Sequence, residues 1–256
     1  MRTRIGFFDS GIGGISVMAA ARRIMPGADY YYYADTDHVP YGTKTREDVI
    51  RYSSCAMDWM TEHEVDAIVI ACNTATSMAA ETLRRTYPIP IIGMEPAVKP
   101  AALRHPHEKV LVCATPLTIA GEKLHTLIDH SFTDEDQPDL VALPGLVERA
   151  ERGEFDPADV VPYLEKTINT EIPYAAIVLG CTHFTYFRDS FRVLFPESEL
   201  IDGTDGTVRR LVSILTDNGR MPTDAKLAHA YRALRTKCAA KCVPSRIPVG
   251  KGSFSS

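Results

Sequence analysis

One pattern occurs twice along this chain and constrains its fold more than any other feature. The segment AIVIACNT at residues 67–74 matches AIVLGCTH at residues 176–183. Each copy is an apolar, strand-like run that ends in a small residue, a cysteine and a polar pair, and then turns into a helical pattern. In open α/β sheets, ligands bind beyond the carboxyl ends of the strands. The repeat therefore predicts two related lobes that place Cys72 and Cys181 on opposite walls of one cleft.

Other short runs rich in Ile, Val and Phe alternate with longer helical patterns. This alternation is typical of βαβ units and a mostly parallel sheet. Strands are expected at residues 4–8, 30–34, 67–71, 89–92, 109–113, 140–143, 176–179 and 199–201. Helices are expected at 46–63, 74–85, 118–130 and 207–217, among others. Four prolines between residues 88 and 100 predict a crossing between lobes near residue 95.

Charge and hydropathy exclude several classes of protein. Residues 226–256 carry seven Lys or Arg and no acidic residue, so the formal charge of −5 leaves −12 on the rest of the chain. An acidic body argues against nucleic acid as a partner. No secretory leader and no apolar run of membrane-spanning length is present in the sequence, which predicts a cytoplasmic protein with no membrane partner.

Six cysteines in a cytosolic chain are expected to be free thiols. Cys55 and Cys113 fit the role of small buried apolar residues. Cys72 and Cys181 suggest a different role, because racemisation at an α-carbon removes a proton from one face and returns one to the other. A thiolate is a competent base and a thiol a competent acid. Since a free thiol has a pKa near ~8.5, we expect the following helix N-termini to stabilise the two thiolates.

Two loops and one histidine supply further candidates. Asp9 and Ser10 precede a glycine-rich turn that lets backbone N–H groups approach an anion; Asp9 could bind an ammonium group or simply cap a helix, and Ser10 could donate to a carboxylate. The turn lacks the third glycine of a dinucleotide-binding loop and the Lys-Ser/Thr pair of a phosphate loop. The turn Pro40-Tyr41-Gly42 is expected over the same sheet edge. His183 is the histidine best placed to orient or protonate a group beside Cys181.

Together, the strings FDSGIGG (8–14), VPYG (39–42), ACNTAT (71–76) and GCTHF (180–184) resemble the glutamate racemase branch of the aspartate/glutamate racemase family. The resemblance covers about residues 4–215. It implies an α/β fold of two pseudo-symmetric lobes, each a mostly parallel sheet flanked by helices, with the active site in the cleft between them. It also implies catalysis without pyridoxal phosphate, metal or any other cofactor.

The same resemblance assigns roles to residues. Cys72 would serve the D-enantiomer and Cys181 the L-enantiomer, assisted by Asp9 and His183. Asp9, Cys72 and His183 are also expected to bind substrate. The other positions expected to do so are Ser10, Pro40, Tyr41, Gly42, Asn73, Thr74, Thr118, Glu148 and Thr182. The expected activity is interconversion of L- and D-glutamate, which would supply D-glutamate for bacterial peptidoglycan. A homodimer is left open.

By the same resemblance, the first lobe comprises residues 1–95 and about 206–225, and the second comprises 96–205. Two segments depart from the family pattern. Residues 114–118 read ATPLT, which leaves the placement of Thr118 open, and residues 226–256 form a basic tail that is expected to be partly disordered. Cys238 and Cys242 in that tail are too few for a zinc site and fit an amphipathic helix better.

Three other functions fit parts of the pattern. An aspartate racemase, or a broader amino-acid racemase, would share the fold and the paired cysteines. A cysteine hydrolase could pair one thiol with His183 but would leave the other thiol without a role. A non-catalytic amino-acid-binding or regulatory protein could use the same fold, because a fold does not fix a function.

Overall fold

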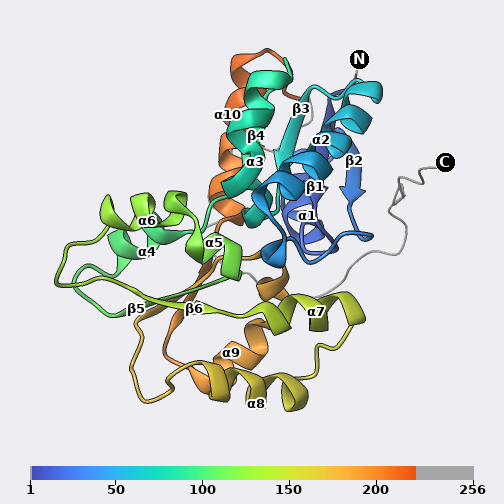
Figure 1. Cartoon of the computed structure of the whole chain (residues 1–256). Helices are drawn as coiled ribbons and strands as arrows, with labels where there is room; N and C mark the ends of the chain where they lie inside the picture. Colours follow the sequence, from blue (N-terminus) through green and yellow to red (C-terminus); the bar gives the residue numbers. More distant parts are fainter. Residues whose placement is uncertain (1, 223–256) are drawn as a thin grey trace.

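The computed structural model describes residues 2–222 and contains two four-stranded parallel sheets, one in each lobe (Figure 1). The first sheet has the order β2-β1-β3-β4 and the second the order β6-β5-β7-β8. Their bounds are β1 Arg4–Asp9, β2 Asp29–Ala34, β3 Ala67–Ile70, β4 Ile91–Gly93, β5 Val110–Ala114, β6 Asp139–Ala142, β7 Ala176–Leu179 and β8 Glu199–Asp202. The predicted α/β fold of two lobes is confirmed.

The two sheets are built alike, which explains the sequence repeat. In each, the first strand pairs with the second and third, and the third also pairs with the fourth. The strands β3 and β7 therefore occupy equivalent positions, and Cys72 and Cys181 follow them at equivalent sheet edges.

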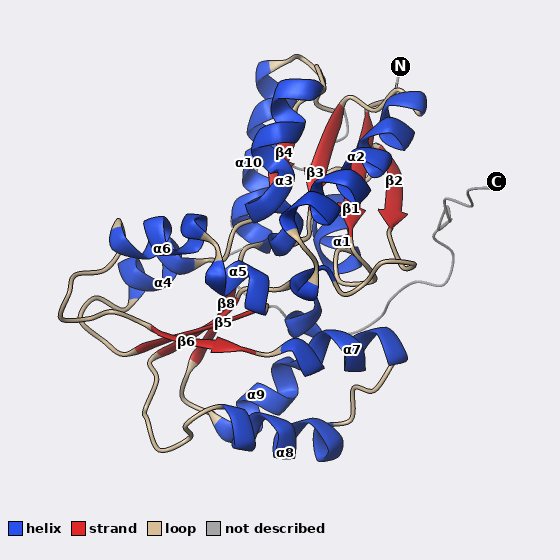
Figure 2. Ribbon diagram, viewed as in Figure 1, coloured by secondary structure: helices blue, strands red, loops and turns tan. Residues whose placement is uncertain are grey.

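Helices cover both faces of each sheet (Figure 2). The helices are α1 Ile15–Ile24, α2 Arg46–Glu62, α3 Asn73–Thr86, α4 Val98–Arg104, α5 Pro116–Ala120, α6 Glu122–Asp129, α7 Pro144–Arg152, α8 Pro157–Thr167, α9 Arg188–Leu194 and α10 Thr204–Asp217. Two 3-10 helices, η1 Tyr41–Thr43 and η2 Thr182–Phe187, complete the elements.

Alternation along the strands determines which helices each side chain meets. In β1, Phe7 packs in a cluster with residues of α1 and α10, whereas Phe8 packs with residues of α2 and α3 on the opposite face. In the second lobe, Leu111 packs towards α7, α8 and α9, and Val112 towards α4 and α6. Burial on both faces is the reason the strands read as continuous apolar runs.

The chain returns to the first lobe at its C-terminal end. After β8, helix α10 packs against α1, β3 and β4, and Figure 1 shows it beside the elements formed by the first hundred residues. Between residues 2 and 222, no helix has both the length and the apolar character needed to span a membrane. The basic segment 226–256, with Cys238 and Cys242, lies outside the described residues.

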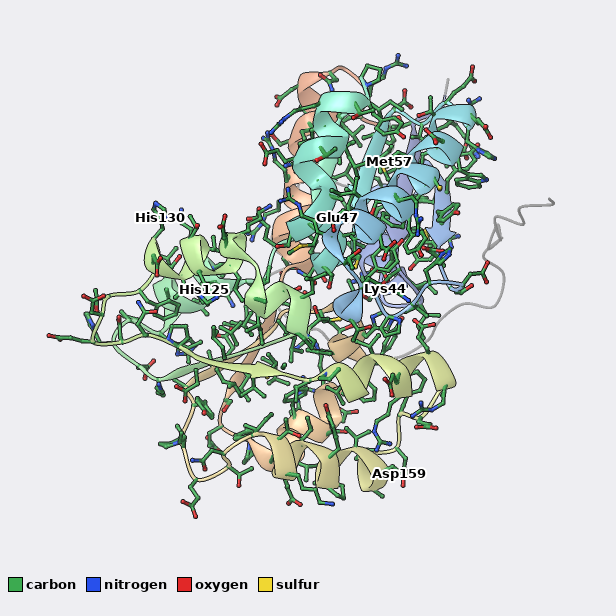
Figure 3. The ribbon with its side chains drawn as sticks, viewed as in Figure 1. Lys44, Glu47, Met57, His125, His130 and Asp159 are labelled. Atoms are coloured by element: carbon green, nitrogen blue, oxygen red, sulfur yellow. The ribbon has the colours of Figure 1, made fainter. Side chains whose placement is uncertain are left out.

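Two helix predictions differ from the structure. The continuous helix expected over residues 118–130 is divided into α5 and α6, because Gly121 adopts an extended backbone (φ −82°, ψ 132°). The segment after Cys181 begins as the 3-10 helix η2 rather than as an α-helix. His125, on α6, and His130, just after it, are exposed (Figure 3).

Candidate active site

The ends of strands β1, β3 and β7 bring together Asp9, Cys72 and Cys181. All three side chains are buried, with exposed fractions of 0%, 5% and 6%. The hydroxyl of Thr182, in the second lobe, donates to Oδ2 of Asp9 in the first at 3.0 Å. The site is therefore formed by both lobes, as the repeat predicts.

Cys72 lies at the N-terminus of α3 and caps it. Its Sγ accepts a hydrogen bond from the backbone N–H of Ala75 at 3.4 Å, and the hydroxyl of Ser10 lies 3.6 Å from the sulfur. Burial and the charge of Asp9 raise the pKa of Cys72 to about 12, although the contacts with Ala75 and Ser10 lower it. The expected stabilisation of the thiolate by the helix is present, but burial outweighs it, and Cys72 is a thiol at neutral pH.

Cys181 has a different partner. It receives no capping hydrogen bond from η2, and its Sγ lies 3.7 Å from Nδ1 of His183, whose Nε2 lies 2.5 Å from Oε1 of Glu151. Burial lowers the pKa of His183, but the combined effect of Cys181, Glu151 and the charge of Asp9 raises it to about 10. His183 is therefore an imidazolium at neutral pH and can stabilise a sulfur anion beside it.

Asp9 is fully buried and does not cap α1, which begins after Gly14 without a side-chain cap. Its Oδ1 accepts from the N–H of Gly11 at 3.0 Å. Burial raises its pKa from 3.8 to about 6, while the charge of His183 and the hydrogen bonds lower it. The group thus changes charge close to neutral pH, which suits a residue that assists proton transfer.

Glu151, rather than the expected Glu148, is the carboxylate that reaches the site. The Glu148 side chain is 56% exposed, and its carboxylate lies 3.9 Å from Arg152. Glu151 is 17% exposed, contacts His183, and accepts a hydrogen bond from the backbone N–H of Ile12 at 2.9 Å. Burial raises the pKa of Glu151, but these two hydrogen bonds and the charge of His183 lower it overall. Helical periodicity could have distinguished them, because Glu151 lies one turn after the buried Val147, whereas Glu148 points away from that face.

The predicted turn at residues 40–42 forms η1 beside the site. A cis peptide bond joins Val39 to Pro40, and the hydroxyl of Tyr41 donates to Oδ2 of Asp35 at 2.6 Å. Gly42 faces the Thr115 side chain of the second lobe so closely that any Cβ would overlap it. The turn therefore contacts both lobes.

Buried hydroxyl groups line the boundary between the lobes. The hydroxyl oxygen of Thr74, in α3, lies 2.9 Å from that of Thr115 and 3.3 Å from that of Thr118, in the second lobe. The structure therefore brings Thr118 to the boundary, despite the departure of residues 114–118 from the family pattern. Thr115, whose hydroxyl caps α5, was not anticipated.

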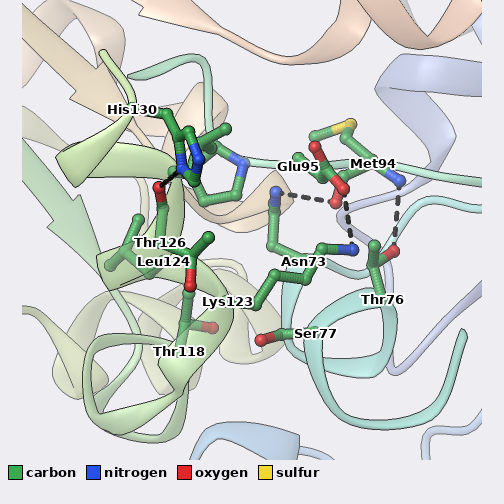
Figure 4. A pocket seen from close by; sticks show the side chains of 12 residues that line it. Asn73, Thr76, Ser77, Met94, Glu95, Thr118, Lys123, Leu124, Thr126 and His130 are labelled. Carbon is green, nitrogen blue, oxygen red and sulfur yellow. Dashed lines mark hydrogen bonds and ion pairs between the residues drawn. The ribbon is translucent and has the colours of Figure 1, made fainter. Parts of the chain in front are cut away.

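A cavity of about 310 Å³ opens beside Asn73, next to Cys72 (Figure 4). It lies among α3, the segment Met94–Pro96, α5 and α6, and an ion pair of 2.7 Å between Glu95 and Lys123 borders it. The amide nitrogen of Asn73 donates to the carbonyl of Met94 at 3.2 Å, while its buried amide oxygen has no hydrogen-bond partner within residues 2–222. Asn73 therefore lines this cavity and directly follows Cys72 in the sequence.

The four cysteines of the described part are free thiols, namely Cys55, Cys72, Cys113 and Cys181. Within that part, no three or more His, Cys, Asp or Glu side chains are grouped as a metal site would require. The arrangement supports acid/base chemistry by two thiols. The charge of Cys181 contributes to raising the pKa of Cys72, so the two sulfurs lie near enough to interact.

Comparisons with known proteins agree with this geometry. A sequence model of the family described as Asp/Glu/Hydantoin racemase matches residues 15–211. The glutamate racemase of Halothermothrix orenii is 50% identical over 219 residues, which cover 84% of this chain and 86% of that protein. The structure of the Escherichia coli glutamate racemase in complex with L-glutamate and the activator UDP-MurNAc-Ala superposes with a TM-score of 0.78 at 29% identity, covering 89% and 86% of the two chains. That of the Francisella tularensis glutamate racemase in complex with D-glutamate gives 0.73 at 27% identity, with 87% and 84% covered.

Proposed function

The chain belongs to the Asp/Glu/Hydantoin racemase family, and on that premise we propose that it interconverts L- and D-glutamate by proton transfer between Cys72 and Cys181. The observation that carries the proposal is the placement of two buried thiols after equivalent strands of two related lobes. The glutamate racemase relatives and the complexes of two of them with L- and D-glutamate support the choice of substrate.

The different partners of the two thiols support a role for each. With L-glutamate, Cys181, beside the His183 imidazolium, takes the α-proton, and the thiol of Cys72 gives its proton to the opposite face of the α-carbon. With D-glutamate the roles are reversed. Each turnover removes one proton from carbon and returns one, so no oxidant or reductant is required. This two-base scheme follows general acid–base catalysis by positioned groups.

Donor groups around the thiols suit an amino acid with two carboxylates. Hydroxyls of Ser10, Thr74, Thr118 and Thr182 are buried at the boundary between the lobes, and Asn73 lies beside Cys72. We propose that these groups, with the turn at residues 40–42, hold the substrate. Preorganised donors at the α-carboxylate would stabilise the negative charge that develops when the α-proton leaves.

We further propose that the D-glutamate supplies peptidoglycan synthesis and that the protein acts in the cytoplasm, where thiols stay reduced. Light scattering at several protein concentrations would test for a homodimer.

Circular dichroism on purified protein tests the activity. After dialysis against a chelator and a carbonyl reagent, L-glutamate should lose its optical signal at an unchanged total concentration of glutamate. L-Aspartate assayed in parallel separates a glutamate racemase from an aspartate or broader racemase. Binding without loss of signal would indicate a non-catalytic amino-acid-binding protein, and a stable acyl-enzyme would indicate a cysteine hydrolase. Activity that returned only with added metal or pyridoxal phosphate would contradict cofactor independence.

A further inference from the structure

A second buried carboxylate, Asp35, lies close to Asp9. Asp35 follows the last residue of β2, and its backbone N–H donates to the carbonyl of Asp9 at 3.1 Å. Its side chain is only 8% exposed. A buried carboxylate is costly unless its oxygens accept hydrogen bonds. The hydrogen-bond partners of Asp35 therefore identify the part of the chain that it positions.

Each oxygen of Asp35 has one such partner. Oδ2 accepts from the Tyr41 hydroxyl at 2.6 Å, and Oδ1 lies 2.7 Å from Nδ1 of His38. Burial and the contact with Asp35 raise the pKa of Tyr41, so the phenol stays a hydrogen-bond donor. The carboxylate thus joins two positions of one loop, before and within η1.

The Tyr41 ring is itself fixed in the core. It is 1% exposed and packs against Phe8 of β1, with 6.2 Å between ring centroids. The next residue, Gly42, faces Thr115, whose hydroxyl contacts Thr74. A shift of Tyr41 would therefore move the turn relative to both lobes.

His38 supports the carboxylate from the surface. Its side chain is 40% exposed, and its ring stacks on Tyr52 of α2 with centroids 3.7 Å apart and 17° between the planes. The imidazole is therefore held at the orientation in which Nδ1 faces Asp35.

We propose that Asp35 is a positioning residue that fixes the Pro40–Gly42 turn for substrate, and that His38 completes its hydrogen bonding. This inference rests on the proposed function, because it assumes that the turn binds glutamate. A turn that contacts substrate equally in the ground state and the transition state affects KM more than kcat.

The experiment compares Asp35→Asn, Tyr41→Phe, their double variant and His38→Ala in a racemase assay in both directions. Loss of one hydrogen bond to a charged group should raise KM about 5- to 50-fold in Tyr41→Phe, with kcat changed less than about 3-fold. Asp35→Asn should raise KM similarly, His38→Ala about 2- to 5-fold, and the double variant no more than the worse single variant.

Tyr87 and Asp58 provide a matched control. They form another Tyr–Asp hydrogen bond of 2.6 Å, between Asp58 of α2 and the residue that follows α3, at the opposite end of α3 from Cys72. Tyr87→Phe and Asp58→Asn should leave KM unchanged. A purely structural role for Asp35 would lower the active fraction, and hence apparent kcat, without changing KM.

An unchanged KM in both Asp35→Asn and Tyr41→Phe, with active wild-type protein, would overturn the inference. If the wild type does not racemise glutamate, the proposed function fails first. Calorimetric titration with L-glutamate then decides the inference separately: equal affinity in wild type and variants overturns it, and weaker binding in the variants supports it.

Discussion

Oε1 of Glu151 lies 2.5 Å from Nε2 of His183 and accepts, at 2.9 Å, the backbone N–H of Ile12 in the other lobe. One oxygen atom therefore orients the partner of Cys181 and joins the loop that follows Asp9. Both interactions favour the charged carboxylate and help to hold His183 as an imidazolium.

Glu151→Gln should lower kcat about 10- to 100-fold, because it removes the charge that supports His183. The reaction of L-glutamate should be affected at least as strongly as that of D-glutamate. Glu148→Gln is the matched control on the same helix and should change kcat less than about 2-fold. Steady-state circular dichroism in both directions measures the effect. Equal losses in the two variants would show that Glu148 also acts in the reaction.

Cys72→Ser and Cys181→Ser should each abolish racemisation in both directions, because every turnover uses both groups. A serine hydroxyl is much less acidic, so kcat should fall by at least about 10²- to 10⁴-fold while glutamate still binds. In D₂O, wild-type product should carry deuterium at the α-carbon, which NMR detects. Near-normal racemisation by either variant would disprove the two-base mechanism.

Asp9→Asn should stabilise the protein at pH 7 while reducing its activity. The pKa of Asp9 rises from 3.8 to about 6 on folding, so the folded state binds more protons in that window and stability falls as pH rises through it. A shift of that size destabilises the folded wild type by about 3 kcal/mol at pH 7. This destabilisation is fully present above about pH 6 and absent below about pH 4. Urea unfolding of variant and wild type at pH 4 and pH 7 measures the difference. A variant less stable than wild type at pH 7 would contradict the prediction.

His183→Asn should destabilise the protein, and most strongly at acidic and neutral pH. The folded-state pKa of His183 is raised from 6.5 to about 10, so its ionic contacts contribute fully below about pH 6.5 and are lost as pH rises through about 10. The stability difference between wild type and variant should therefore shrink between pH 6.5 and pH 10. Unfolding in urea at pH 6, 8 and 10 tests this. A difference that grows with pH would mean that His183 is neutral in the folded protein.

The sequence predicts the fold well because pattern and structure agree locally. All eight expected strands form. The signal is strongest for β3, β5 and β7, because strands buried on both faces must be apolar along their length. The helix expected over 118–130 is wrong at one position, where Gly121 takes an extended conformation. An isolated glycine in a helical pattern indicates such a break only weakly, because helices also tolerate glycine.

The site is less predictable than the fold. Cys72, Cys181, Asp9 and His183 lie at strand ends or directly after them, where a repeat and a strand rule can locate them. Thr115 contacts Thr74 in the other lobe, and Asp35 contacts His38 and Tyr41 through an irregular loop. No helical or strand pattern encodes either set of contacts.

The unlike surroundings of the two thiols have a kinetic consequence. Cys72 faces a helix N-terminus and Ser10, whereas Cys181 faces an imidazolium. The two enantiomers have equal free energies in water, so the equilibrium constant between them is one, and kcat/KM must be the same in both directions. The structural asymmetry of a glutamate-racemising site can then change KM and kcat only together: the enantiomer with the lower KM also has the lower kcat.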